Sequence, residues 1–232
     1  MKKTAILAIT AATMLTASIG FAAPLTDYSA GKTSIDLTWR NSDIYGKAPD
    51  GNTSLDKKYN LDWGITTGLG NHFAIQYNGY NAKSKDTVEY SNVFETESMN
   101  IKLKTQELNV LYKLDKNISV YAGLVRLKAT VNQNEEVSGV NMSSSFSSDN
   151  KNKLQIGLVG STKIADKTTA YASVGVASDF TNWKVGLAQE IAPNVEFNVD
   201  YRRLKAKKIG IDNVGDADIT AKGLGFGVTC KF

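Results

Sequence analysis

The last fourteen residues, 219–232, read ITAKGLGFGVTCKF and decide the fold class. From Leu224 to the end, every second side chain is apolar, and the positions between them are small or polar. A period of two predicts a β-strand with one apolar face and one polar face. The strand ends on the aromatic Phe232, although the ends of soluble chains usually fray into water. We therefore expect the closing strand of a transmembrane β-barrel, with lipid outside and a polar lumen inside.

The composition narrows the class of protein. The chain has 232 residues, 42% of them hydrophobic, with 19 Gly and 3 Pro, which is typical of one folded β domain. Its formal charge of +4 falls to about +2 without Lys2 and Lys3, too little to indicate a nucleic-acid partner. The single Cys230 excludes an internal disulfide, and the single His72 argues against a zinc site. We expect no cofactor and no metal.

Residues 1–22 have the features of a secretory signal peptide. Two lysines precede an apolar run at 5–16, and small residues occupy the −3 and −1 positions of a cleavage site after Ala22. Residues 23–232 would then form the exported barrel domain; an amphipathic first helix of the mature fold is the alternative. No later stretch approaches the roughly 18 apolar residues of a membrane helix, so we expect a membrane crossing by strands.

Alternating segments recur along the mature chain. Their connections near residues 69, 116, 166 and 193 are very short, whereas most others are long and polar. This pattern predicts an all-β fold: a closed antiparallel transmembrane β-barrel of about ten strands, or eight, with short periplasmic turns and long extracellular loops. The expected strands span 33–42, 59–66, 73–78, 107–114, 118–129, 154–161, 168–178, 183–190, 195–202 and 219–232.

Two segments do not fit a single alternation. Ile101 and Leu103 have the opposite phase to the strand that follows them, which predicts a bulge or a register break. The phase of 118–129 stays open, because two apolar sets compete there. A Ser/Asn-rich stretch, 131–152, is expected to form a mobile loop, as is 81–101.

A secreted β-sandwich would also alternate, but its apolar face would point inward. Against it stand the terminal aromatic residue, the unequal connections and aromatic residues near the strand ends, where membrane girdles lie. Those aromatic residues are Trp39, Tyr59, Trp63, Tyr112, Trp183 and Tyr201.

The leader, the alternating strands and the ending Cys230-Lys231-Phe232 resemble the small outer-membrane barrels grouped as porin-like or opacity-like β-barrel domains. The resemblance covers the whole mature chain as a pattern. It implies a location in the bacterial outer membrane, among its lipid and lipopolysaccharide. It also implies that the barrel-assembly machinery reads the last strand; the assembly signal would be Leu224, Phe226, Val228 and Phe232.

Charged residues recur on the expected inward faces. The lumen of a barrel this narrow is barely wider than its side chains, so opposite charges should pair across it. We expect a salt-bridged plug or, alternatively, a narrow charge-graded ion path. The expected lumen charges are Asp36, Arg40, Asp62, Glu107, Lys184, Glu196, Asp200, Arg202 and Lys222.

Basic residues gather where strands meet the expected outer surface. Cations there would be stabilised by lipopolysaccharide phosphates, although a solvated rim explains them equally well. The candidate lipopolysaccharide contacts are Arg203, Lys205, Lys207 and Lys208.

The sequence does not indicate an enzyme. Some barrels resembling this one are hydrolases, but the only His, His72, is expected beside a periplasmic turn, out of reach of an external substrate. Cys230 falls on the lipid face and is expected to act as a small apolar side chain. We expect a structural or porin-like role, or alternatively a surface adhesin or host-factor binder that acts through 81–101 and 130–152.

Overall fold

The computed structural model describes residues 24–49, 51–92 and 95–232, and these form twelve antiparallel strands without a helix. The expected leader, 1–22, lies outside the described residues. The strands are β1 (Thr33–Ala48), β2 (Gly51–Gly70), β3 (Phe73–Lys83), β4 (Thr87–Ser91), β5 (Glu95–Asp115), β6 (Ile118–Val137), β7 (Val140–Ser147), β8 (Lys151–Ala165), β9 (Thr168–Ala177), β10 (Phe180–Ala192), β11 (Val195–Ile211) and β12 (Gly215–Lys231).

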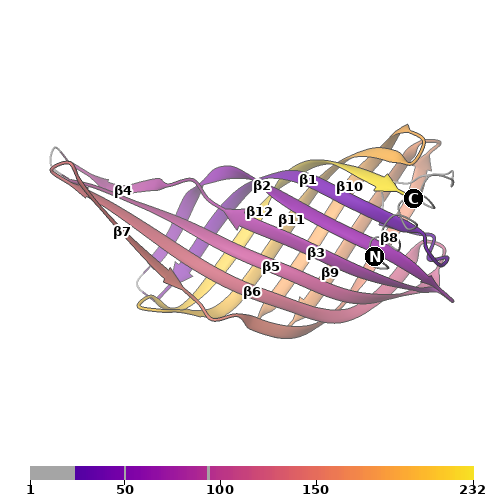
Figure 1. The fold of residues 1–232 in the computed structure, drawn as a ribbon, viewed down its shortest axis with the longest axis horizontal. Helices are drawn as coiled ribbons and strands as arrows, with labels where there is room; N and C mark the ends of the chain where they lie inside the picture. Colours follow the sequence, from indigo (N-terminus) through magenta and orange to yellow (C-terminus); the bar gives the residue numbers. More distant parts are fainter. Residues whose placement is uncertain (1–23, 50, 93–94) are drawn as a thin grey trace, which may run out of the picture.

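The strands close into a barrel (Figure 1). Ten of the described strands have neighbours on both sides, in the order β1, β2, β3, β5, β6, β8, β9, β10, β11 and β12, and β12 returns to β1. The other two, β4 and β7, pair only with the far ends of β5 and β6. The expected barrel is confirmed, and its closed ring has the expected ten strands. The total of twelve is higher because β4 and β7 lie in stretches that were expected to be loops.

One end of the barrel carries both the start of β1 and the chain end. The amide N–H groups of Thr33 and Phe232 donate to each other's carbonyl oxygens at 3.0 and 2.8 Å. The short connections β2–β3, β5–β6, β8–β9 and β10–β11 lie at this end, which is the periplasmic end of an outer-membrane barrel.

The expectation of long extracellular loops is wrong. At the outer end the strands simply run further: β1 continues to Ala48, β2 begins at Gly51, and β11 and β12 are joined by three residues. β5 and β6 run furthest, and with β4 and β7 they form a sheet that projects from the barrel (Figure 1). We call these four strands, at residues 87–91, 95–100 and 130–147, the projecting sheet.

In the periplasmic half, outward side chains are apolar and inward side chains are polar. On β12, Leu224 and Phe226 are 52% and 44% exposed, whereas Thr229 on the opposite face is fully buried. This is the arrangement of a strand between lipid and a polar lumen.

In the outer half the pattern inverts. On β11 the inward series continues from Arg202 to the buried apolar Leu204 and Ala206, while the outward series continues to Arg203 and Lys205. The change from apolar to charged outward residues marks the height at which the strands leave the hydrocarbon. Above that height the barrel is built like a soluble β protein, with an apolar inside and a charged outside.

This inversion also explains Ile101 and Leu103. The expected register break is absent, since β5 pairs without a shift from Lys102 to Tyr112 with β3 and from Glu95 to Lys113 with β6. Both side chains simply point into the barrel at a height where its interior is apolar.

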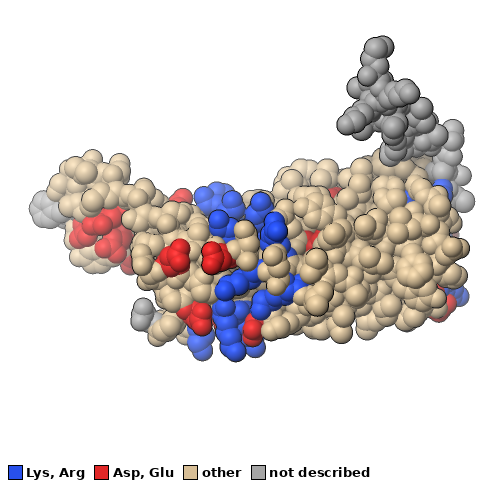
Figure 2. Space-filling view, turned by 60° about the horizontal axis from the view of Figure 1, so that its bottom comes forward, with Lys and Arg blue, Asp and Glu red and all other residues tan. Residues whose placement is uncertain are grey.

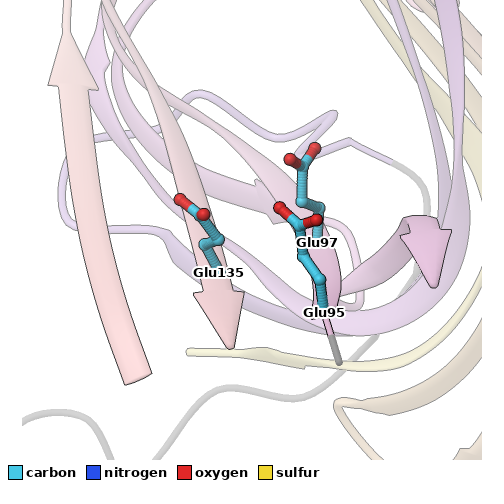
Figure 3. Close-up of side chains that lie close together, drawn as sticks. All are labelled: Glu95, Glu97 and Glu135. Carbon is cyan, nitrogen blue, oxygen red and sulfur yellow. The ribbon is translucent and has the colours of Figure 1, made fainter. Parts of the chain in front are cut away.

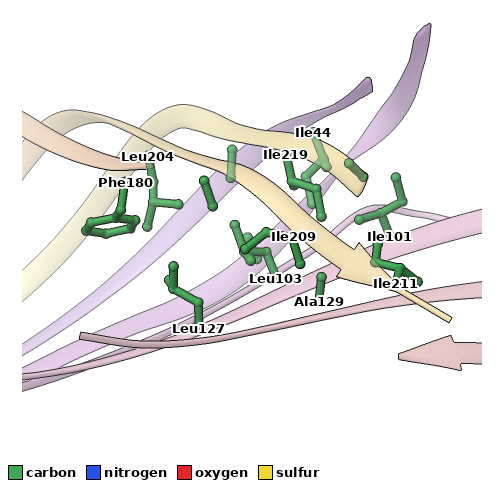
Figure 4. Close-up of a cluster of buried hydrophobic side chains, with 14 of the residues drawn as sticks. Ile44, Ile101, Leu103, Leu127, Ala129, Phe180, Leu204, Ile209, Ile211 and Ile219 are labelled. Carbon is green, nitrogen blue, oxygen red and sulfur yellow. The ribbon is translucent and has the colours of Figure 1, made fainter. Parts of the chain in front are cut away.

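The apolar interior of the outer half is a packed core (Figure 4). Burying each Leu or Ile in such a core contributes about 1.5–3 kcal/mol, so the cluster stabilises the barrel above the membrane. Its buried members are Ile44, Leu55, Tyr80, Ala82, Ile101, Leu103, Val125, Leu127, Ala129, Val131, Phe180, Leu204, Ala206, Ile209, Ile211, Ala217, Ile219 and Ala221.

The segment before β1 closes the periplasmic mouth. Leu25 and Tyr28 are only 5% and 3% exposed and pack with barrel residues including Leu111 and Tyr121. The Tyr28 hydroxyl donates to Ser119 Oγ at 2.9 Å.

The first turn of this segment and the wall of β2 fit each other closely. A Cβ at Gly68 would lie 2.4 Å from the carbonyl oxygen of Ser29, so only glycine fits. Ser29 donates from its hydroxyl and its amide to Asp27 Oδ1 at 2.6 and 3.0 Å, and these hydrogen bonds hold the pKa of Asp27 below its usual range.

Within the described residues, no helix is long and apolar enough to cross a membrane.

Candidate functional site

Two arginines and one aspartate form the centre of the lumen. Arg40 on β1 donates from Nη2 to Asp62 Oδ2 at 2.9 Å, and Arg202 on β11 donates from Nη1 to Asp62 Oδ1 at 2.9 Å. Asp62 on β2 thus holds both guanidinium groups. All three side chains are at most 10% exposed, so each charge is paired where water cannot screen it.

Two further acids extend this network around the wall. Arg40 Nη1 lies 2.5 Å from Asp200 Oδ1, and Arg202 Nη2 lies 3.0 Å from Glu107 Oε1. The five charged residues come from β1, β2, β5 and β11, so the network spans the lumen. The sequence predicted all five as lumen charges, and the structure brings them together.

Neutral groups from the remaining walls complete the network. Asn182 accepts from Arg202 Nε at 2.9 Å and donates to Glu107 at 3.1 Å, and the Tyr171 hydroxyl donates to Asp200 at 3.3 Å. The Tyr80 ring lies 5.0 Å from the Arg202 Cζ and 5.9 Å from the Arg40 Cζ, within cation–π range. These partners were not foreseen, because an Asn or Tyr on an inward face carries no sign of its partner in the sequence.

The inward glycines of β12 make room for the arginine. A Cβ at Gly225 would lie 3.0 Å from Arg40 Cζ and 2.6 Å from Thr38 Cγ2. The glycine therefore does not leave a gap in the lumen, because Arg40 from the neighbouring strand fills it.

A second charged group lies toward the periplasmic end. Thr229 donates to Asp36 Oδ1 at 2.5 Å, and Lys231 Nζ lies 3.6 Å from Glu196 Oε2. The sequence predicted Asp36 and Glu196 as lumen residues but missed Lys231. The alternation of the last strand could have found it, because Lys231 has the same phase as Thr229.

Between the described residues of the lumen lies a small cavity. A cavity of about 80 Å³ lies among residues of the network and of the segment before β1, including Asp36, Asp62, Arg202 and Pro24. That volume holds only a few water molecules.

The two remaining lumen candidates behave differently. Lys184 points inward, with Nζ 5.7 Å from the centroid of the Tyr171 ring. Lys222 was expected in the lumen, but it lies on the outer surface. In the sheet register it is the neighbour of Asp43 on β1 and Arg203 on β11, and its Nζ lies 4.5 Å from the centroid of the Tyr45 ring. Lys222 is two residues before the lipid-facing Leu224 and therefore on the same face of β12. The alternation of the strand already predicted an outward position, so the expectation was wrong.

The outer surface carries a basic belt of Lys and Arg between the largely uncharged part of the barrel and the projecting sheet (Figure 2). The belt residues lie on the outward faces just above the apolar band. They are Lys102, Lys104, Arg126, Lys128, Arg203, Lys205, Lys207, Lys208 and Lys222. Lys205 and Lys208 also form ion pairs with Asp218 and Asp179 at 3.6 and 3.9 Å.

The projecting sheet has two different faces. On the face continuous with the lumen, the carboxylates of Glu95, Glu97 and Glu135 come together from β5 and β6, with oxygens within 4.8 Å of one another (Figure 3). The other face is uncharged over much of its area, where Asn132 donates to Asn100 at 2.8 Å and Ser143 donates to Asn134 at 3.0 Å.

The remaining predicted residues lie where the alternation put them. His72 is exposed in the β2–β3 turn, against the Tyr112 ring at 6.1 Å. Cys230 lies on the outward face, where its neighbours in the sheet register are Ile35 on β1 and Val195 on β11. Leu224, Phe226 and Val228 of the expected assembly signal also face outward, along the seam at which β12 joins β1, and Phe232 follows β12 directly.

Comparisons with known proteins agree with this architecture. The family model described as outer membrane protein beta-barrel domain matches residues 9–232. A comparison with curated proteins gives no match. Among solved structures, the outer membrane protease OmpT from Escherichia coli has a TM-score of 0.58 at 11% identity, over 87% of this chain and 96% of that chain.

Two other solved structures are similar at lower scores. Ail, the attachment invasion locus protein of Yersinia pestis, has a TM-score of 0.42 at 13% identity, over 85% of this chain and 97% of that chain. OprG from Pseudomonas aeruginosa has a TM-score of 0.37 at 12% identity, over 90% of this chain and 99% of that chain. At such identities the likeness concerns the fold alone. Because the family match covers almost the whole sequence, the chain belongs to the outer membrane protein beta-barrel domain family, whose members reside in the bacterial outer membrane.

Proposed function

We propose that this protein is a non-conducting outer-membrane anchor that displays the projecting sheet as a binding surface. Of the two roles expected from sequence, structural or porin-like and surface-binding, the geometry favours a structural barrel that presents a contact surface. The observation that carries this proposal is the filled lumen.

The lumen is closed at three heights. Leu25 and Tyr28 occupy the periplasmic mouth, the network around Asp62 spans the middle, and the apolar core fills the outer half. An ion would have to leave water, separate buried ion pairs and cross an apolar core. Each of these steps is costly, so a steady current through the native barrel is not expected.

Display is supported by the length of β5 and β6. From Lys128, its last belt residue, to Val137, β6 runs on for about 30 Å at roughly 3.3 Å per residue. A barrel needs no such extension to stay in the membrane, so we infer that the sheet serves contacts outside it.

We infer that the barrel is not an enzyme. Its only His lies exposed at the periplasmic turn, in contact with an aromatic ring and on the opposite end from the projecting sheet. A general base at that place could not reach a substrate outside the cell.

We also propose roles for the belt and the last strand. Arg203, Lys205, Lys207 and Lys208, with the rest of the belt, would hold lipopolysaccharide phosphates at the membrane surface. The outward residues of β12 would be read by the barrel-assembly machinery before the barrel closes.

Planar-bilayer recording of the refolded protein tests the closed lumen. We expect no steady channel events from the native protein, at potentials where a refolded porin of similar size conducts. Reproducible unitary currents that change when Asp62 or Arg202 is neutralised would overturn the proposal and restore the ion path.

A further inference from the structure

The edge strand β7 lacks the features that usually protect an open sheet edge. It reads VNMSSSFS over its eight residues. Among the residues that the structure describes, it pairs only with β6, apart from a bridge from Ser148 to Ile211 just beyond its lower end. Natural edge strands carry charges, prolines, bulges or are very short, because an open edge pairs with other strands. β7 has no charge and no proline, and its register with β6 is unbroken.

The other edge of the projecting sheet is protected. β4 has five residues, includes Glu89, and its register with β5 shifts between Val88 and Tyr90. The contrast between the two edges shows that only β7 is suited to strand addition.

The turn before β7 identifies the backbone groups that point outward. Ser138 and Gly139, with φ of 49° and 83°, form a two-residue turn between the paired Val137 and Val140. In such a hairpin the closing pair exchanges hydrogen bonds, so every second residue of β7 points its N–H and C=O away from β6.

Hydrogen bonds at the lower end agree with this assignment. The Ser147 carbonyl, on the open side, accepts from the Asp212 amide at 3.4 Å, and the Ser148 amide, on the β6 side, donates to Ala129 at 2.9 Å. The open edge therefore consists of the main-chain groups of Asn141, Ser143 and Ser145, and all three residues are exposed.

A second copy of β7 suits this edge. Centred on Ser143, an antiparallel copy would place Ser143 opposite itself and Asn141 opposite Ser145, so no charges meet. The acidic Glu135 and Glu136 lie one strand further in, on β6. An edge strand that carries charges could place like charges opposite each other when it pairs with its own copy, which is unfavourable.

The symmetry of that pairing fixes where the second copy lies. The two-fold axis that relates adjacent antiparallel strands is perpendicular to their sheet. Since the projecting sheet continues the barrel wall beyond its outer end (Figure 1), this axis lies in the plane of the membrane and inverts the second barrel. In a copy in the same membrane, β7 would instead point in the same direction as the first β7. The two strands would also cross at twice the angle between β7 and the barrel axis.

From these observations we propose that β7 pairs antiparallel with β7 of a second copy in a facing outer membrane, so that projecting sheets of two cells join into one. This inference rests on the proposed role of the sheet as a contact surface. The contact is far smaller than the roughly 1,200 Å² of a stable complex. Single molecules would bind weakly, and cells would adhere through many copies acting together.

The test uses two differently labelled populations of a Gram-negative host that express the full chain, and it counts mixed clusters by flow cytometry. Expressing cells should cluster with expressing cells and not with cells that lack the protein. Because the two-fold places Ser143 opposite itself, cells with Ser143→Lys or Ser143→Glu should each lose at least tenfold of their own clustering. Mixing the Lys and Glu populations should restore it, which a misfolded variant could not do.

Ser143→Ala is the matched control and should cluster as the native protein does, since it keeps the main chain. Failure of the Lys and Glu populations to complement each other, or clustering unaffected by either charge, would overturn β7 self-pairing. Equal clustering with cells that lack the protein would also overturn it, while leaving the sheet as a contact surface for another ligand. Absence of any clustering overturns it too, and none of these results bears on the closed lumen, which bilayer recording tests separately.

Discussion

Arg202 Nη1 lies 2.9 Å from Asp62 Oδ1, although the two residues are 140 positions apart in the chain and their strands are separated in the ring by β1 and β12. The contact forms only when the barrel closes. It therefore couples the filling of the lumen to the closing of the wall.

Removal of Arg202 should be strongly destabilising. In Arg202→Ala, Asp62 loses one of its two cationic partners and Glu107 loses its ion pair, and breaking a buried pair typically costs about 3–5 kcal/mol. Urea unfolding of the refolded protein in phospholipid vesicles measures this loss. Arg203→Ala, the next residue on the outward face, is the control and should change the free energy of unfolding by less than about 1 kcal/mol.

Truncation in the outer half should have the effect of a core mutation. Leu204 is fully buried, so Leu204→Ala should lower the free energy of unfolding by about 2–5 kcal/mol through lost burial and a cavity. Were this half an open vestibule, the same change would cost almost nothing. Leu154→Ala is the control, because it removes the same atoms from an outward side chain that is 79% exposed. The difference between the two variants measures the contribution of packing inside the barrel.

A side chain at Gly225 should displace Arg40. Gly225→Ala introduces a Cβ 2.6 Å from Thr38 Cγ2 and 3.0 Å from Arg40 Cζ, so the network must shift and stability should fall by about 1–3 kcal/mol. Gly160→Ala is the matched control, because its Cβ would meet only the Asn117 carbonyl oxygen at 3.8 Å. Equal effects of the two substitutions on unfolding would contradict the role assigned to Gly225.

The segment before β1 should contribute to stability. Tyr28→Phe removes a buried hydrogen bond to Ser119 and should lower the free energy of unfolding by about 0.5–1.5 kcal/mol, whereas Tyr59→Phe at an exposed site should leave it unchanged.

Intact-mass measurement of the exported protein should find Ala23 as its first residue, since Pro24 and Leu25 already contact the barrel interior. Retention of the leader would contradict the expected cleavage site.

Much of the membrane-embedded half could be predicted from the sequence, because lipid outside and polar groups inside impose one alternation. The phase of Leu224 and Phe226 is enough to place Thr229 inside. Pairing partners such as Asp62 and Arg202 could be nominated as lumen charges, but which atoms meet depends on the barrel's closure and register, which no local pattern contains.

The outer half was misjudged for a physical reason. Where the strands leave the membrane, the inward face becomes apolar and the outward face charged, so a window across this height shows no single alternation. Residues 204–218, which fall between the expected strands 195–202 and 219–232, are mostly part of β11 and β12 for this reason. β7 was expected to be a mobile loop because of its serines, yet it is held as a strand by pairing with β6.

The inversion at the membrane surface is the central claim, and spin-label accessibility along β5 tests it most directly. Single cysteines at each position from 101 to 112, in a Cys230→Ser background, would be labelled and exposed to oxygen, which partitions into lipid, and to a water-soluble nickel complex. We expect oxygen access at 108, 110 and 112, nickel access at 102 and 104, and neither at 101 and 103. Lipid access at 101 and 103, or nickel access at both, would contradict the account.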